Sequence, residues 1–346
     1  MKVKKIISIF SVVLLFIALI YGYILYNKVF SANTKFSENE TFVYVPTDAT
    51  YPQVQKILEP YVNNMEYFDF VASKRGYDQN VVSGKFLLTN GMSSFDIVRA
   101  LRKNVPVKMA FNNQESLGKL VQRLSSQIEP DSITLMKTFT DSTFMAENGF
   151  TEDNVLSMFI PNTYEFYWNT TGIKVRDKMI KEYRKFWNED RLAKAKALDL
   201  TPLEVSALAA IVHKETAKVD ERPRVAGVYL NRLKVDMPLQ ADPTVIYAVK
   251  RESGDFDRVI KRVLYEDLKI NSPYNTYIHT GLPPGPIAMP DINAIDAVLN
   301  AEKHDYIYFC ASVEKFGYHE FAATLAQHGV NKKKYVEWLA KQGINR

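Results

Sequence analysis

Glu215 is the residue of this sequence whose position points most clearly to chemistry. It lies in a helical pattern that opens at Thr201-Pro202-Leu203-Glu204, where the threonine can cap the helix, the proline suits its first turn and the glutamate completes a capping box. With the register set there, at about 100° per residue, one stripe of the helix contains Leu208, Ile211, Val212 and Glu215. A carboxyl group therefore occupies a position where an apolar side chain would be expected.

A carboxyl group in such a stripe has two physical explanations. Removing a carboxylate from water is costly unless it is paired or takes up a proton, and a buried carboxyl group that keeps its proton near neutral pH suits acid catalysis. The alternative is a structural ion pair with Arg222, Arg224 or Arg232 of the helix predicted from Pro223, or a helix end in water. The position alone leaves these alternatives open.

Polar and aromatic residues that could bind a ligand follow this helix. In the run 239–244, Asp242 precedes Pro243 and is predicted either to cap the next helix or to serve a site. Two proline-stiffened loops without periodicity follow at 271–277 and 280–287. Amides and tyrosines held on such loops suit a hydroxyl-rich ligand, although plain surface loops have the same composition.

The elements that must position these residues are those of an α+β protein. A small module is predicted at 42–105, with strand-like alternation at 42–45 and 84–88, helical patterns between them and a helix that Ser93 can cap. Farther on, the aromatic-rich run 159–168 either contributes to the core or lines a sugar-binding groove. Core is favoured because aromatic side chains are usually buried.

The first thirty residues are a separate segment. No charged residue occurs from Ile6 to Asn27, and as a helix this apolar run would reach roughly 33 Å, which matches the hydrocarbon core of a bilayer. Three lysines among the first five residues, against Lys28 after the run, predict a cytoplasmic N-terminus and an exported remainder. A cleavable signal peptide ending near Ser31-Ala32 is the alternative, but the run is longer than usual for one. We predict an uncleaved single-pass anchor at 1–30 and a polar linker at 31–41.

Composition argues against several other classes of protein. The 346 residues, 47% of them hydrophobic, suffice for two or three packed domains once the anchor is set aside. The net charge of +5 is spread among acidic residues and forms no basic groove, so no nucleic-acid partner is predicted. The single cysteine, Cys310, excludes an intramolecular disulfide and a thiolate metal cluster, and its apolar surroundings indicate a buried small side chain rather than a catalytic thiol.

Several runs occur in an order that is specific when taken together. The run around the glutamate is Ala209-Ala210-Ile211-Val212-His213-Lys214-Glu215-Thr216, and the others are 160–164, 228–233, 239–247, 272–277, 281–287 and 317–321. Over most of residues 155–330 they resemble the YceG-like, or MltG, family of endolytic murein transglycosylases. His213 stands where the family more often has glutamate or another polar residue, and Asn162 where aspartate is commoner.

The resemblance implies a reaction and a set of residues. The reaction is cleavage of the β-1,4 bond between N-acetylmuramic acid and N-acetylglucosamine inside a glycan strand, leaving a 1,6-anhydro end, with Glu215 as general acid and then general base and with no metal or cofactor. The residues expected to bind substrate are Asn231, Gln240, Asp242, Tyr274, Asn275 and Tyr277. The module at 42–105 would be a LysM-like subdomain, matched at 83–88 and 90–93, and residues 106–346 would form the YceG-like catalytic domain.

The same resemblance implies a setting in the cell. The anchor would hold the chain in the bacterial inner membrane, with the catalytic domain outside the cytoplasm. Its partners would be peptidoglycan glycan strands and the membrane, with peptidoglycan synthases as further candidates and termination of nascent strands as the biological role.

Two rival functions come from other classes. A metal enzyme is suggested by His213-Lys214-Glu215, but no downstream Pro-Cys-x-x-Cys run exists and His319 lacks a second histidine four residues on, so neither zinc signature is complete. The second rival is a non-catalytic membrane-anchored scaffold that binds peptidoglycan or recruits other proteins.

Overall fold

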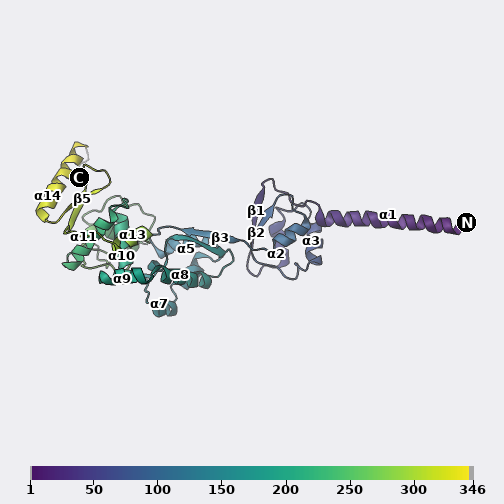
Figure 1. The fold of residues 1–346 in the computed structure, drawn as a ribbon, viewed down its shortest axis with the longest axis horizontal. Coiled ribbons are helices and arrows are strands. Elements are labelled where there is room, and N and C mark those ends of the chain that lie inside the picture. The colour runs from purple at the N-terminus through teal and green to yellow at the C-terminus, as the bar shows by residue number, and fades with distance from the viewer. Residues whose placement is uncertain (1, 343–346) are drawn as a thin grey trace. The chain divides into compact units, whose positions relative to one another are not determined.

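The structure, a computed structural model, describes residues 2–342 as a mixture of helices and two-stranded sheets (Figure 1). The chain divides into two compact units. The first comprises Met1–Met109, Gln127–Glu129 and Glu165–Thr170, and the second comprises Ala110–Ser126, Pro130–Tyr164 and Thr171–Arg346. Glu215 belongs to the second unit.

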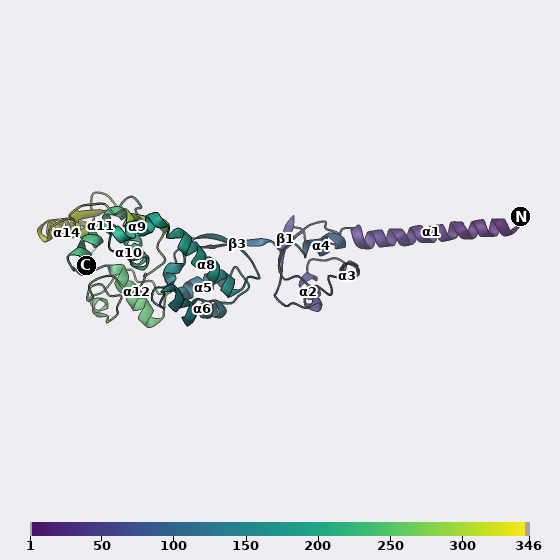
Figure 2. The same cartoon turned by 60° about the horizontal axis from the view of Figure 1, so that its bottom comes forward.

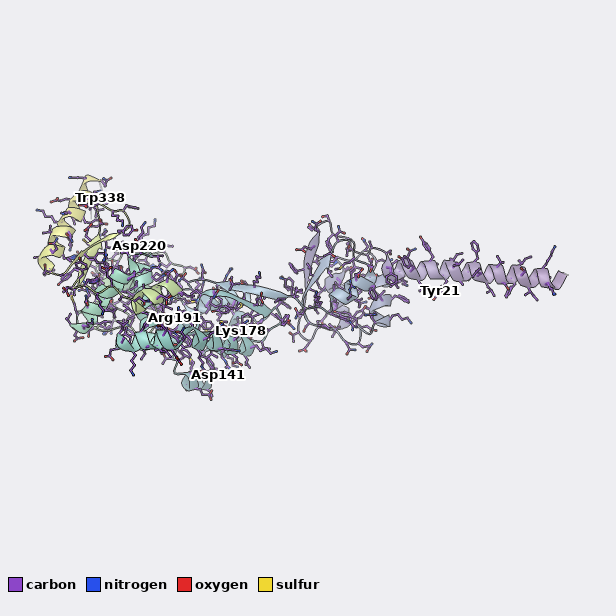
Figure 3. The ribbon with its side chains drawn as sticks, viewed as in Figure 1. Tyr21, Asp141, Lys178, Arg191, Asp220 and Trp338 are labelled. Atoms are coloured by element: carbon purple, nitrogen blue, oxygen red, sulfur yellow. The ribbon has the colours of Figure 1, made fainter. Side chains whose placement is uncertain are left out.

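Helix α1 (Lys2–Phe30) contains the segment Lys4–Phe30, which is long and apolar enough to cross a membrane by its length and composition. The side chains of residues 4–24 are exposed, and Tyr21, for example, projects from the helix with 62% of its surface exposed (Figure 3). At its C-terminal end the ring of Phe30 contacts that of Phe95, with centroids 5.7 Å apart. So much exposed apolar surface is expected of a helix that has lipid around it.

The first unit contains the predicted pair of strands. β1 (Glu40–Val45) and β2 (Gly84–Thr89) are antiparallel, with Val43 opposite Phe86. Their inward side chains form the core with helices α2 (Tyr51–Leu58), α3 (Met65–Lys74) and α4 (Ser94–Ala100). The strand predictions are confirmed, as is the Ser93 cap, which accepts a hydrogen bond from the third residue of α4. The likeness of this module to a LysM domain stays a prediction.

The prediction of a polar linker at 31–41 is wrong for residues 31–35. These residues pack into the first unit through isolated bridges from Ala32 to Ser93 and from Thr34 to Val62. The amide of Asn33 is buried and donates hydrogen bonds to the Asn64 carbonyl and the Ser94 hydroxyl, both at 2.9 Å. The short polar side chains of this segment indicated contact with water. In the structure, the Asn33 side chain instead forms hydrogen bonds with polar groups at the starts of α3 and α4.

The aromatic-rich run lies on β4 (Asn162–Tyr167) and just before it. β4 pairs with β3 (Pro106–Phe111). Phe159, Tyr164 and Phe166 are buried, and the Tyr164 ring stacks on that of Phe111 with centroids 5.4 Å apart. The prediction of core is confirmed for these three rings. The neighbouring elements are α5 (Leu117–Ser125), α6 (Ser132–Phe139), α7 (Ser142–Asn148), the 3-10 turn η1 (Val155–Met158) and α8 (Gly172–Phe186).

Helix α10 (Pro202–Glu215) is the centre of the second unit (Figure 2). The run Val205, Ser206, Ala207, Leu208, Ala209, Ala210, Ile211 and Val212 is buried without interruption. The helices around it are α9 (Glu189–Ala197), α11 (Arg222–Lys234), α12 (Asp242–Ser253) and α13 (Ile292–Leu299). Because α10 is covered over most of its length, the position of its last residue is closely determined.

The remaining elements complete the second unit. They are the 3-10 turn η2 (Asp267–Lys269), the antiparallel strands β5 (Tyr308–Ala311) and β6 (His319–Ala322), and helix α14 (Leu325–Lys341). Cys310 lies half-buried on β5, and burial raises the pKa of its thiol, which keeps it protonated and unreactive.

Gly285 generates a test of how the second unit is packed. A Cβ atom there would collide with the backbone carbonyl of Asp153, so loop 280–287 depends on this glycine to lie against the residues before η1. We expect Gly285→Ala to lower the free energy of unfolding by about 1–3 kcal/mol in urea titrations. Gly118→Ala in α5 is the control, because its nearest obstacle is the Ser116 hydroxyl at 3.7 Å, and it should match or exceed the native stability. Equal effects of the two changes would contradict the close contact.

Candidate active site

The start of α10 sets the register that places Glu215. Thr201 and Glu204 form the predicted capping box, in which the Glu204 carboxylate accepts from the Thr201 backbone N–H at 2.7 Å. Fourteen residues run from Pro202 to Glu215, after which Thr216 adopts an extended backbone. The helix prediction is confirmed, and Glu215 is the last residue of a helix that is buried in the core from Val205 to Val212.

The Glu215 carboxyl group is surrounded by protein and only partly accessible to solvent. The Tyr229 hydroxyl of α11 donates a hydrogen bond to its Oε1 atom at 2.9 Å. Burial raises the pKa of Glu215 from 4.5 to about 7, and the negative charge of Asp242 acts in the same direction. The Tyr229 hydrogen bond and the positive charge of Arg232 lower this pKa, but they do not outweigh burial.

The ion-pair alternative is not what the structure shows. Arg224 pairs with Glu302 at 3.0 Å, and Arg222 with Asp291 at 3.4 Å. Arg232 donates to backbone carbonyls instead, to Ile307 at 2.7 Å and to Leu239 at 2.8 Å. In the part of the chain that the structure describes, none of the three arginines pairs with Glu215. The carboxyl group is therefore held in a form that can exchange a proton.

Asp242 and Tyr277 form a second polar pair close enough to act on Glu215. The Tyr277 hydroxyl donates to the Asp242 carboxylate at 2.6 Å. Burial, followed by the bond to Asp242, raises the pKa of Tyr277 far above the neutral range, so the hydroxyl remains a donor. The negative charges of both carboxyl groups contribute to this shift. The structure thus brings together three of the predicted site residues, Glu215, Asp242 and Tyr277.

Of the two alternatives for Asp242, the one in which it caps α12 is wrong by one residue. The N-cap is Ala241, whose backbone N–H donates to the Thr276 hydroxyl at 3.1 Å. The preceding backbone N–H, that of Gln240, donates to the Thr276 carbonyl at 3.0 Å. Loop 271–277 therefore holds the backbone of residues 240–241 in place, with Ala241 extended, and the Asp242 side chain is released from capping to bind Tyr277.

Gln240 has an unusual backbone conformation for its residue type. Its φ of +49° lies in the left-handed region, which is costly for a side chain with a Cβ, and its side chain is exposed. Such strain persists only where the surroundings impose it, and it is concentrated at functional sites. Its contact with substrate stays a prediction.

Three further predicted ligands are engaged inside the protein. Tyr274 is fully buried and its hydroxyl donates to the Asp153 carbonyl at 3.2 Å. The buried Asn275 amide donates to the carbonyls of Leu268 and Ile270, in and just after η2, both at 2.9 Å. The Asn231 amide donates to the carbonyls of His304 at 2.7 Å and Tyr306 at 3.1 Å. These side chains stabilise the loops around the site, and their role as substrate ligands stays a prediction.

Two groups of residues were not predicted as parts of the site. Tyr229 lies on α11, and only the packing of α11 against α10 brings its hydroxyl to Glu215. The second group fixes the chain just after Glu215. The buried Glu221 carboxylate accepts from the Thr216 hydroxyl at 2.9 Å and from the His319 backbone N–H at 2.7 Å. The His319-Glu320 pair was the available sequence signal for this contact, but its partner Glu221 lies far away in the sequence.

The histidine of the possible zinc motif lies in a different environment from Glu215. The Nδ1 atom of His213 is 3.1 Å from the Asp291 carboxylate. Burial lowers the pKa of His213, although Asp291 opposes the shift. Within residues 2–342, no three side chains of the metal-binding types gather in one group.

Comparisons with known proteins show the family of the chain. The model of the YceG-like family matches residues 43–334, and the chain belongs to this family. The endolytic murein transglycosylase of Bacillus subtilis strain 168 is 36% identical over 176 residues, which cover 51% of this chain and 46% of that protein. The endolytic murein transglycosylase of Streptococcus pneumoniae D39 is 27% identical over 87% of this chain and 59% of its own length. The chain thus spans about half to three-fifths of these curated relatives.

A solved structure supports the fold. The crystal structure of a yceG-like protein from Listeria monocytogenes is 26% identical, and the match covers 85% of this chain and 99% of that one with a TM-score of 0.57. The family match includes the first-unit module from residue 43 onward.

The raised pKa of Glu215 predicts a dependence of stability on pH. The folded state keeps a proton that the unfolded state loses above pH 4.5, so the contribution of this group is complete below pH 4.5 and is lost as the pH rises to about 7. Glu215→Gln keeps an acceptor for Tyr229 but cannot ionise. We expect it to equal the native chain near pH 4.5 and to be more stable by up to about 3 kcal/mol at pH 8.

Urea unfolding across this pH range measures the effect. Of the three tryptophans of the chain, Trp187 is buried in the core around α10, so its part of the fluorescence change reports on the second unit, which contains Glu215. A stability difference between the two proteins that stays constant with pH would contradict the raised pKa.

Proposed function

We propose that this chain is an endolytic peptidoglycan lytic transglycosylase with Glu215 as its single acid and base. The observation that carries the proposal is a partly accessible carboxyl group with a pKa of about 7 and a tyrosine bound to one oxygen. Membership of the YceG-like family and two relatives named endolytic murein transglycosylases support the same class of reaction. The bond cleaved would be the β-1,4 link from N-acetylmuramic acid to N-acetylglucosamine.

The first step uses the protonated form of Glu215. Its proton passes to the glycosidic oxygen as the bond to the anomeric carbon of the muramic acid breaks, so the N-acetylglucosamine leaves with a new hydroxyl group. A carboxyl group with an ordinary pKa would hold little proton at neutral pH, whereas one with a pKa of about 7 is half protonated. The Tyr229 hydrogen bond stabilises the carboxylate that this step creates.

The second step uses the carboxylate. Glu215 accepts the proton of the muramic acid 6-hydroxyl while that oxygen attacks the anomeric carbon, which closes the 1,6-anhydro ring and returns the enzyme to its protonated form. No water is consumed. A second carboxyl group that activates water, as in inverting hydrolases, is therefore unnecessary.

Other polar groups at the site, exposed or half-buried, would orient the sugars. Tyr277 is fixed by Asp242, and Gln240 is presented by a strained backbone on the adjoining segment. Amide and hydroxyl groups of this kind suit the acetamido groups and hydroxyls of the glycan. We assign Gln240, Asp242 and Tyr277 to substrate binding.

The anchor would place this chemistry at the outer face of the bacterial cytoplasmic membrane. Helix α1 is apolar enough to span a bilayer, and the lysines before it favour a cytoplasmic N-terminus. A tethered enzyme meets glycan strands near the membrane, where they are made. Termination of nascent strands, in contact with peptidoglycan synthases, is the role that this placement favours.

Digestion of purified glycan strands tests the proposed function. We expect the full chain in detergent to release fragments with 1,6-anhydro ends, detected by mass spectrometry. Glu215→Gln should lower the rate at least about a thousandfold, because the proton donor is lost while the acceptor for Tyr229 remains. Glu252→Gln, an exposed change on α12, is the matched control and should retain full activity.

The other outcomes identify the rivals. Reducing ends would indicate a hydrolase. Intact strands that remain bound to the protein would indicate a non-catalytic scaffold, and loss of cleavage with a chelator, restored by zinc, would indicate a metal enzyme.

A further inference from the structure

A cavity of about 440 Å³ lies in the second unit beside the end of α10 and has no part in the reaction proposed above. One wall is a single face of α12, formed by Pro243, Ile246, Tyr247 and Lys250 at helical spacing. Lys214 of α10 closes another side. Its volume falls in the range of small-ligand sites. We call it the lysine cavity.

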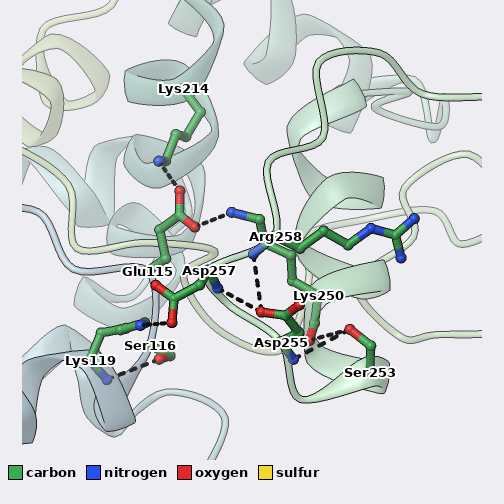
Figure 4. Close-up of polar contacts among 9 residues, drawn as sticks. All are labelled: Glu115, Ser116, Lys119, Lys214, Lys250, Ser253, Asp255, Asp257 and Arg258. Carbon is green, nitrogen blue, oxygen red and sulfur yellow. Dashed lines mark hydrogen bonds and ion pairs between the residues drawn. The ribbon is translucent and has the colours of Figure 1, made fainter.

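The charges of the lysine cavity centre on one carboxylate shared by two lysines (Figure 4). Glu115 accepts from the Lys214 ammonium at one oxygen and from the Lys250 ammonium at the other, both at 2.6 Å. Burial acts to raise the pKa of Glu115, but the two lysines together hold it below its ordinary value, so the group is ionised. One negative charge thus faces two positive charges.

The rim of the cavity is balanced in charge, so this excess of positive charge remains. Asp257 is already bound by Lys119 at 2.5 Å, and its segment is held by hydrogen bonds that the backbone N–H groups of Asp257 and Arg258 donate to the Asp255 carboxylate. Arg258 also lines the cavity, and its exposed guanidinium is directed away from Glu115 (Figure 4). A ligand that carries a carboxylate would therefore be attracted electrostatically.

The remaining walls are apolar. Ile246, Ile260 and Ile287 line the cavity together with the rings of Tyr247 and Phe256. Cationic groups on one side and aliphatic side chains on the other suit a short anionic peptide with small side chains, whereas a bare sugar would leave the apolar walls without a partner.

The chain neighbours of both carboxyl groups of the candidate site line the cavity. Lys214 immediately precedes Glu215, and Pro243 immediately follows Asp242, with neighbouring α-carbons about 3.8 Å apart. Successive helical side chains diverge by about 100°, so Lys214 faces the cavity while Glu215 faces Tyr229. The lysine cavity therefore begins one residue along the chain from each of the two carboxyl groups.

On the basis of the proposed function, we propose that the lysine cavity binds the peptide stem attached to the muramic acid at the cleaved bond. A stem carboxylate pairs with Lys214 and Lys250 in place of, or beside, Glu115, and the small stem side chains contact Ile246 and Tyr247. The enzyme is therefore selective for strands that carry peptide stems over stripped strands of the same length.

Cleavage of two matched substrates by the full chain tests this selectivity. One substrate is glycan strands with stems, and the other is the same strands after an amidase has removed the stems. We expect kcat/KM to be at least about tenfold higher with stems. Lys250→Gln should reduce the ratio to about two or less, and Lys250→Arg should largely restore it.

A surface lysine supplies the matched control. Lys194 on α9 pairs with Asp190 at 2.9 Å in an exposed position, so Lys194→Gln should leave the ratio unchanged. Amidation of the stem carboxylates should lower the ratio for the native chain, which tests the charge without any change in the protein.

The outcomes separate the two proposals. Equal cleavage of both substrates by the native chain, or an unchanged ratio in Lys250→Gln, overturns the stem site and leaves the transglycosylase proposal intact. If neither substrate is cleaved, the transglycosylase proposal fails, and calorimetric binding of a soluble muramoyl tripeptide decides the stem site. Binding that Lys250→Gln weakens about tenfold supports it, and binding that is absent or unaffected overturns it.

Discussion

The burial of one carboxyl group at the end of α10 is the constraint on which the rest of the site depends. An uninterrupted buried run, from Val205 to Val212, leads the helix through the core to Glu215. The surrounding arginines could have neutralised this group, but they bind backbone carbonyls and other carboxylates. An ion pair would have kept the pKa of Glu215 low. Desolvation raises this pKa instead, and the hydrogen bond from Tyr229 offsets the rise only in part. The same surroundings that make the helix a stable core element thus make its last residue an acid.

Long-range contacts complete what the helix begins. Loop 271–277 fixes residues 240–241 through Thr276, and in doing so it starts α12 at Asp242 and directs that carboxylate toward Tyr277. The negative charge so placed raises the pKa of Glu215 further. Next to Glu215 on α10, Lys214 shares the Glu115 carboxylate with Lys250 of α12. Two regions of opposite charge therefore flank the end of α10, one suited to proton transfer and the other to binding an anion.

Local signals were predictable from the sequence, and contacts between distant segments were not. The capping box at Thr201 and the two strands of the first unit follow from neighbouring residues, and the structure has them where they were expected. The cap of α12 was displaced by one residue because Thr276, far along the chain, determines it. Asn275 was predicted to bind sugar because amides suit that task, but an amide equally satisfies a loop's own carbonyls. Tyr229 carries no local sign that its hydroxyl meets a carboxyl group.

Titration of the Glu215 carboxyl group tests the central claim most directly. In protein labelled with 13C at glutamate side-chain carboxyl groups, the resonance that disappears in Glu215→Gln should titrate with a midpoint near pH 7. Tyr229→Phe should raise that midpoint, because the hydrogen bond it removes favours the ionised form. A midpoint near 4.5, the ordinary value, would mean that the group is ionised at neutral pH and would contradict the account.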